Sequence, residues 1–185
     1  MRRYSVDPPA ALFEALRSCH AGIKRILSSP FGTKVAGVGT VYVELADGRW
    51  LSIGADQEDL EPRFEVFPIT AALSDPSTSA TLESTVSMTA PVSYELLDTE
   101  DWLDPSVECE GALGANPIAQ CQGKPGAAPV TASAACRYAG GVRFRSAGGV
   151  ELVVATLPFP YSLYCSAIPQ GATFDGALYG SRAEA

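Results

Sequence analysis

The chain has 185 residues and a mass of 19.4 kDa; 46% of the residues are hydrophobic and 18% are charged. This composition is globular, which excludes disorder, collagen and a coiled coil, and the length suits a single domain over residues 1–185. The net charge of −8 is uneven, because residues 35–110 carry −14 while the flanking segments carry +4 and +2. Since an acidic surface repels phosphate backbones, we expect no direct binding to nucleic acid.

The sequence contains no pattern typical of a membrane span or a secretion signal. No stretch reaches the roughly 18 uninterrupted apolar residues of a transmembrane helix. Asp7, Glu14 and Arg17 interrupt the start of the chain before the apolar core of a signal peptide could form. We therefore expect a cytoplasmic protein that does not bind membranes.

An amphipathic helix is the first predicted element, within residues 1–30. Asp7 followed by two prolines is typical of a helix start. Between Pro9 and Leu27 the apolar residues recur at helical spacing: Leu12, Leu16, Cys19, Ile23 and Ile26. A Ser-Ser-Pro sequence then ends the helix. The apolar stripe predicts that this helix packs on a sheet.

From residue 34 the apolar period changes to two, which is typical of strands. Thr40–Leu45 and Arg49–Ile53 flank an Asp-Gly pair, which is a strong local signal for a hairpin. A third strand, Arg63–Ile69, has aromatic residues on both faces. Together these strands predict a three-stranded meander over residues 34–73.

The middle of the chain is less regular. Pro91–Leu97 alternates like a strand and runs directly into an acidic segment that contains a tryptophan, so residues 91–104 form one unit. Residues 105–135 are rich in Gly, Ala, Pro, Gln and Asn, and their prolines argue against a helix. We expect a long irregular insertion there, a kind of segment that is often functional or disordered.

Residues 138–168 repeat the plan of the first meander. Gly141–Ser146 and Val150–Thr156 flank a Gly-Gly turn, and Phe159–Ser166 follows as a third strand. The similarity is one of pattern and not of identity, and because three-stranded meanders are common, chance explains it better than a duplication. The predicted fold class is therefore α+β: an N-terminal amphipathic helix packed on a mostly antiparallel sheet built from two three-stranded meanders, with a long irregular Gly/Pro-rich insertion.

Two acidic runs provide the candidate binding residues. Aromatic side chains ringed by charges are frequent energetic centres of binding surfaces. The predicted partner-binding residues are Trp102, Asp98, Glu100, Asp101, Asp104, Asp56, Glu58, Asp59 and Glu61. In the alternative arrangement, Trp102 and Leu103 pack into the core and the surrounding carboxylates face water.

The sequence contains no motif for catalysis or metal binding. The cysteines are separated by eleven or more residues and form no CxxC pair, which argues against zinc: Cys19, Cys109, Cys121, Cys136 and Cys165. The only histidine, His20, would point away from its neighbour Cys19 on a helix. The run from Asp56 lacks the glycine and the final acid of an EF-hand loop. We expect no cofactor and favour a protein that is not an enzyme.

The leading functional hypothesis is a non-catalytic interaction domain whose acidic face binds a basic protein. An inhibitor or immunity-type protein has this profile. Two alternatives stay open. A small enzyme or ligand-binding domain would have a pocket beneath residues 105–135 and use carboxylates such as Asp98 or Asp101. A subunit of a larger assembly would use the neutral surface and the two-faced aromatic strand at residues 63–69.

Overall fold

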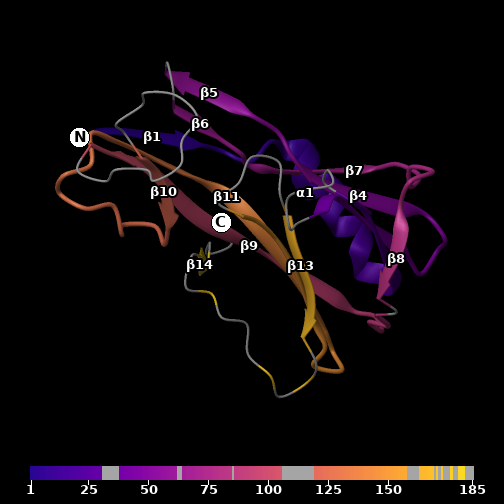
Figure 1. Ribbon diagram of the computed structural model, residues 1–185. Coiled ribbons are helices and arrows are strands. Elements are labelled where there is room, and N and C mark those ends of the chain that lie inside the picture. Colours follow the sequence, from indigo (N-terminus) through magenta and orange to yellow (C-terminus); the bar gives the residue numbers. More distant parts are fainter. Residues whose placement is uncertain are drawn as a thin grey trace.

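The computed structural model describes residues 1–30, 38–61, 64–84, 86–105, 119–157, 163–168, 170, 172, 176 and 179–181. Strands make up most of this part of the chain (Figure 1). Its one α-helix, α1 (Ala10–Arg17), continues into a short 3-10 helix, η1 (Ser18–Ala21). The protein is therefore mostly β, and the predicted α+β class is wrong.

Twelve of the strands in the described residues join in one sheet that curls strongly (Figure 1). The strands are β1 (Arg2–Val6), β2 (Ile23–Pro30), β3 (Val38–Leu45), β4 (Trp50–Ala55), β5 (Glu58–Glu61), β6 (Phe64–Val66), β7 (Ile69–Leu73), β8 (Thr81–Ser84), β9 (Val92–Asp104), β10 (Ala119–Gly123), β11 (Ala134–Ser146), β12 (Glu151–Thr156), β13 (Leu163–Ile168) and β14 (Gly180–Ser181). The main path runs β10-β9-β11-β12-β13-β3-β2-β8, and β5 and β6 form a separate hairpin. The pairing of β1 with β11 is parallel, whereas the other strand pairs are antiparallel.

The helix is shorter than predicted because Gly22 ends it. Gly22 has a φ of 113°, and its N–H donates to the carbonyl of Cys19. That backbone conformation is open to glycine and stops a right-handed helix. The chain continues as β2, which pairs with β3 and β8. Ile23 and Ile26 are buried as the apolar stripe suggests, but they reach the core from a strand.

The glycine turns form the two predicted hairpins, but the meanders are wrong as units of the sheet. Gly48 and Gly149 both have positive φ in the turns that join β3 to β4 and β11 to β12. The predicted third strand divides at Pro68, which has no N–H for a ladder: β6 pairs with β5, and β7 pairs with β4. β11 also pairs with β9 and β1, so the second hairpin belongs to a larger sheet. Residues 158–162 lie outside the described part of the chain.

The longest strands of the described residues, β9 and β11, lie side by side along 13 residues each. The strand predicted at Pro91–Leu97 therefore continues through the whole acidic segment to Asp104. The predicted irregular insertion contains β10 and the first residues of β11, while residues 106–118 lie outside the described part. Because β9 has β11 on one edge and β10 and β14 on the other, its backbone is paired in the interior of the protein.

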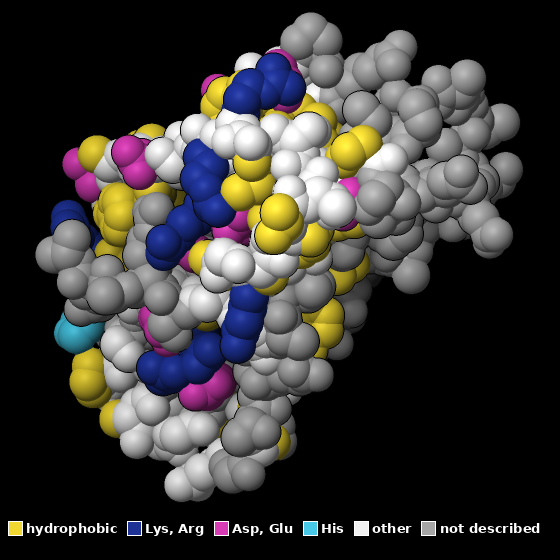
Figure 2. All heavy atoms as spheres, turned by 90° about the vertical axis from the view of Figure 1, so that its left-hand side faces the viewer, with side chains coloured by type: hydrophobic (Ala, Val, Ile, Leu, Met, Phe, Trp, Pro, Cys, Tyr) yellow, Lys and Arg dark blue, Asp and Glu magenta, His cyan; other side chains and the backbone are white. Residues whose placement is uncertain are grey.

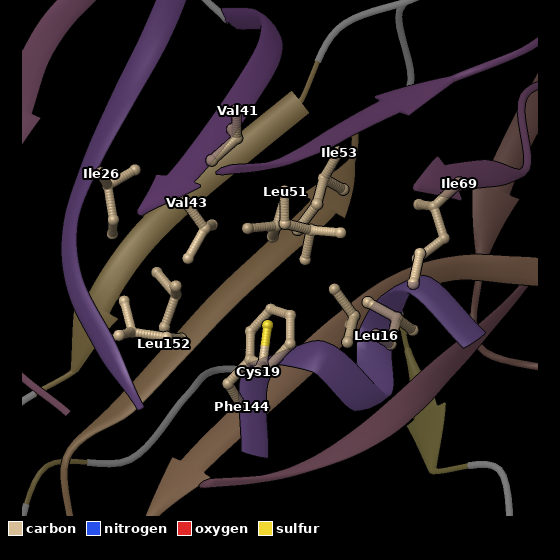
Figure 3. Close-up of a cluster of buried hydrophobic side chains, with 14 of the residues drawn as sticks. Leu16, Cys19, Ile26, Val41, Val43, Leu51, Ile53, Ile69, Phe144 and Leu152 are labelled. Atoms are coloured by element: carbon tan, nitrogen blue, oxygen red, sulfur yellow. The ribbon is translucent and has the colours of Figure 1, made fainter. Parts of the chain in front are cut away.

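The main core lies between α1 and the inner face of the curled sheet. Figure 3 shows side chains from α1, η1 and several strands converging there, including Leu16, Cys19 and Phe144. Each fully buried aliphatic side chain of this kind stabilises the fold by roughly 1.5–3 kcal/mol. A smaller cluster, which includes Phe64 and Tyr138, lies beneath the β5–β6 hairpin. The hairpin thus covers the end of the sheet that lies away from α1.

Candidate functional site

The four carboxylates around Trp102 are buried, whereas the sequence analysis placed them on an exposed face. Asp98 is 0% exposed, Glu100 3%, Asp101 5% and Asp104 4%. They lie on a strand with neighbours on both edges, and both of its faces are covered. Since an isolated buried carboxylate is costly, each must have polar partners nearby.

Trp102 is half-buried and packs against β10, while Leu103 is in the core. The ring lies over Gly123: a Cβ atom at that position would be 2.6 Å from Trp102 Cη2. The segment is therefore not an exposed binding surface centred on Trp102. The alternative holds only for Leu103, which is in the core, because the acidic neighbours do not face water. The tryptophan stabilises the contact between two strands.

The second acidic run forms part of the β5–β6 hairpin. Asp56, Glu58 and Asp59 are exposed, as a binding surface requires. Glu61 is half-buried: Arg2 Nη1 lies 2.5 Å from its Oε2, and the Tyr4 hydroxyl donates to the same oxygen over 3.3 Å. The structure therefore leaves three of the nine predicted site residues as exposed carboxylates.

Alternation along β9 divides its buried acids between two faces of the sheet. Asp101 lies on the face beneath the β5–β6 hairpin, where the Tyr138 hydroxyl donates to Oδ1 over 3.0 Å and Gln120 Nε2 donates to Oδ2 over 2.9 Å. Gln120 also donates to the backbone carbonyl of Glu65, which links this pair to the hairpin. Burial raises the pKa of Asp101 from 3.8 to about 6 against the lowering effect of these hydrogen bonds.

Glu100 lies on the opposite face, in a row with two residues of neighbouring strands. The register places Arg137 of β11 opposite Glu100 and Ser5 of β1 opposite Arg137. Directly opposite residues share a face of the sheet, so these three side chains lie together. Glu100 Oε2 accepts a hydrogen bond from the backbone N–H of Gly126, whose φ of 85° shapes the turn after β10.

Two arginines compensate the carboxylates of this face. Arg137 donates from Nε to Asp98 Oδ2 over 2.7 Å, and its Nη2 lies 2.5 Å from the same oxygen. Arg3 Nη1 lies 3.7 Å from Glu100 Oε1, an ion-pair distance too long for a hydrogen bond. Glu100 Oε1 is buried and has no hydrogen-bond partner. Both arginine side chains are more than half exposed.

An open pocket of about 520 Å³ lies beside these side chains, at the end of the sheet that holds β1. Its lining is formed by Arg3, Tyr4, Ser5, Glu100, Pro125, Gly126, Ala135 and Arg137. Figure 2 looks at this end of the molecule, where Lys and Arg side chains lie in a row with Asp and Glu side chains among them. Ala135 is small and leaves room between the charged side chains. The lining therefore combines charged groups of both signs with apolar groups.

Most of this pocket is not predicted by the sequence. Arg3 and Ser5 alternate with Tyr4 and Val6, which is the period of a strand, but the segment was treated as the approach to a helix. Arg137 was not singled out, because nothing local indicates that it faces Asp98, 39 residues away. Of the predicted site residues, Glu100 lines the pocket and Asp98 holds one of its arginines.

The side chains that line this pocket are charged, hydroxyl-bearing or apolar. The pocket is lined by neither cysteine nor histidine, so a thiol–imidazole pair is not available there. Burial raises the pKa of the Cys19 thiol to about 12, which keeps it protonated and unreactive near neutral pH. In the described residues, no group of three or more His, Cys, Asp or Glu side chains is arranged to hold a metal ion.

Comparison with protein-family models, with curated proteins and with solved structures found no match for this chain. No helix among the described residues is long and apolar enough to cross a membrane. Inferences about function therefore rest on the geometry of the pocket and on the exposed surface of the hairpin.

Proposed function

We propose that the protein binds a small polar molecule in the pocket between β1, β9 and β11. The observation that carries this proposal is Glu100, whose buried Oε1 lacks a hydrogen-bond partner although it belongs to a residue that lines a pocket. Buried polar atoms are almost always hydrogen-bonded, so an exception needs an explanation. A ligand that donates a hydrogen bond to Glu100 Oε1 would explain why this atom has no partner within the protein.

The two arginines support the same conclusion. Asp98 is fully buried and fixes the Nε edge of Arg137, so the rest of that planar guanidinium keeps a set direction at the pocket wall. Arg3 lies on the neighbouring strand, and its side chain is 64% exposed. A charged donor held in place next to a buried acceptor, as Arg137 is by Asp98, is typical of ligand sites, which combine a few placed polar groups with a pocket.

This proposal corresponds to a ligand-binding domain with a carboxylate in its pocket, and it differs in detail from the sequence-based version. Glu100 lines the pocket, whereas Asp101 lies on the other face of the sheet. Pro125 and Gly126 supply the wall that comes from the segment at residues 105–135. Another pocket, lined by Arg17, His20, Val92, Ser93 and Tyr94, carries its charged groups on exposed side chains and has less to hold a ligand.

The test is a nuclear magnetic resonance screen of small polar compounds against the intact chain. A pocket ligand should shift the amide signals of Ser5, Gly126 and Arg137. Arg3→Gln should weaken binding, whereas Arg2→Gln should leave it unchanged. Arg2 is the matched control, because it is equally exposed on β1 and is paired with Glu61, away from the pocket. Equal loss in both variants, or no compound that shifts these amides, would refute the proposal.

A second candidate function rests on the outer face of the β5–β6 hairpin. Asp59 and Glu65, which lie opposite each other in the register, are exposed there, whereas Phe64 and Val66 turn inward to the core. The acidic face can attract a basic protein, which is the interaction proposed from the sequence. An Asp59→Lys/Glu65→Lys variant should lose any basic partner that the wild-type protein captures from host lysate at low salt and releases at moderate salt. Equal capture by both proteins would exclude the hairpin.

A further inference from the structure

We infer that the ligand of this pocket is a small zwitterion, a molecule with an ammonium group and a carboxylate close together, as in a free amino acid or a short peptide. This inference rests on the proposed function and names its ligand class. It follows from the order of charges across the three strands: Arg3 on β1, Arg137 on β11 and Glu100 on β9. A ligand must satisfy both signs to fit there.

The ammonium group belongs at Glu100. Its Oε2 already accepts the Gly126 N–H, and its Oε1 faces only the guanidinium of Arg3, 3.7 Å away. An ammonium has three N–H donors and can approach a carboxylate closely, so it replaces this long ion pair with a short charge-assisted hydrogen bond. Arg3 can give way because its side chain is long and mostly exposed.

The carboxylate of the ligand belongs at the arginines. When Arg3 leaves Glu100, its planar fork is free for a carboxylate, a geometry that guanidinium recognises with two parallel hydrogen bonds. Arg137 uses Nε and Nη2 on Asp98 and keeps Nη1 for the pocket. The ligand thus inserts between Arg3 and Glu100. Glu100 exchanges the guanidinium of Arg3 for the ammonium group of the ligand, and Arg3 exchanges Glu100 for the carboxylate of the ligand.

Charge balance selects against simpler ions. A ligand with only a carboxylate draws Arg3 away and leaves Glu100 buried without a cation, which is strongly unfavourable. A ligand with only an ammonium satisfies Glu100 but leaves the arginines with water. A volume of about 520 Å³ is within the range of small-molecule sites, so the backbone of an amino acid or dipeptide can fit with its side chain directed outward.

The experiment compares three forms of each common L-amino acid by calorimetry and by resonance shifts of the pocket amides: the free amino acid, its N-acetyl derivative and its primary amide. Blocking either charged group should weaken binding about tenfold or more, the usual effect of losing a hydrogen bond to a charged group. In Glu100→Gln the preference for the free amine over the acetylated form should disappear. Arg2→Gln should keep the wild-type order of affinities.

The outcomes separate this inference from the function on which it rests. N-acetyl amino acids that bind as tightly as free ones would overturn the zwitterion and leave an anion pocket. Amides that bind as tightly would overturn it and leave a cation pocket. If no amino acid shifts the pocket amides at millimolar concentration, the ligand class is wrong, while the broader screen of polar compounds still decides whether the pocket binds at all. If Glu100→Gln does not fold, the three forms compared on the wild-type protein decide alone.

Discussion

Replacing Asp101 by Asn should change how the stability of the protein depends on pH. Burial raises the pKa of Asp101 from 3.8 to about 6, so between these values the folded protein holds a proton that the unfolded chain releases. Raising the pH from about 4 to about 6 therefore destabilises the fold, and at higher pH this loss of stability stays constant. Because a tenfold change in proton affinity corresponds to about 1.4 kcal/mol, ionising Asp101 costs about 3 kcal/mol.

Asn cannot titrate, so the free energy of unfolding of the variant should rise relative to wild type by up to about 3 kcal/mol between pH 4 and pH 7. If the asparagine makes poorer hydrogen bonds with Tyr138 and Gln120, the free energy of unfolding of the variant falls by the same amount at every pH. Urea unfolding, followed by the fluorescence of Trp50 and Trp102, measures both proteins at each pH. The exposed Asp59→Asn is the control, and we expect changes within about 0.5 kcal/mol. Parallel curves for wild type and Asp101→Asn would refute the argument that burial dominates.

Three further substitutions test other parts of the structure, each by urea unfolding. Gly123→Ala should lower the free energy of unfolding by about 1–3 kcal/mol, because the new methyl group would lie 2.6 Å from the ring of Trp102. Gly54→Ala is the control and should cost less, because the atom nearest to its new methyl group is 3.6 Å away. Equal losses of stability in the two variants would argue against the contact between Gly123 and Trp102. Gly22→Ala should destabilise the fold by about 1–3 kcal/mol, since alanine tolerates a φ of 113° poorly and its Cβ would lie 3.0 Å from a backbone carbonyl oxygen. An unchanged urea midpoint of unfolding would contradict the argument that the backbone conformation of Gly22 ends the helix. Arg137→Ala should cost about 3 kcal/mol because it removes a cation from a fully buried aspartate, whereas Arg145→Ala, which pairs with partly exposed glutamates, should cost about 1 kcal/mol or less. A cost at residue 137 no larger than that at residue 145 would refute the role of the buried pair.

Short-range features were predictable because their causes are local. The Asp-Gly and Gly-Gly turns specify hairpins through backbone conformations that glycine adopts readily, and both hairpins are present. The segment after Gly22 was not predictable in the same way. The spacing of Ile23 and Ile26 fits one face of a helix and would put them on opposite faces of a regular strand. Both side chains reach the core from β2 because its pairing with β3 is irregular between Ile23 and Arg25, and no local pattern marks that irregularity.

The candidate site also depends on contacts between residues that are far apart in the sequence. Carboxylates at 98, 100, 101 and 104 suggest an exposed acidic surface, since charged residues are rarely buried without partners. Their partners lie far along the chain: Gly126 for Glu100, Arg137 for Asp98 and Tyr138 for Asp101. No local pattern links such residues, so their burial could not be foreseen.

By itself, the sequence determined the β-rich periodicity, the two hairpin turns and the strong acidity of the middle third, because each depends on neighbouring residues or on simple composition. The tertiary structure decided which acids meet water and which meet arginines. Pairing β1 with β11 and β11 with β9 brings Arg3, Arg137 and Glu100 side by side. Long-range strand register alone sets that arrangement, because a shift by one residue would turn each side chain to the other face of the sheet.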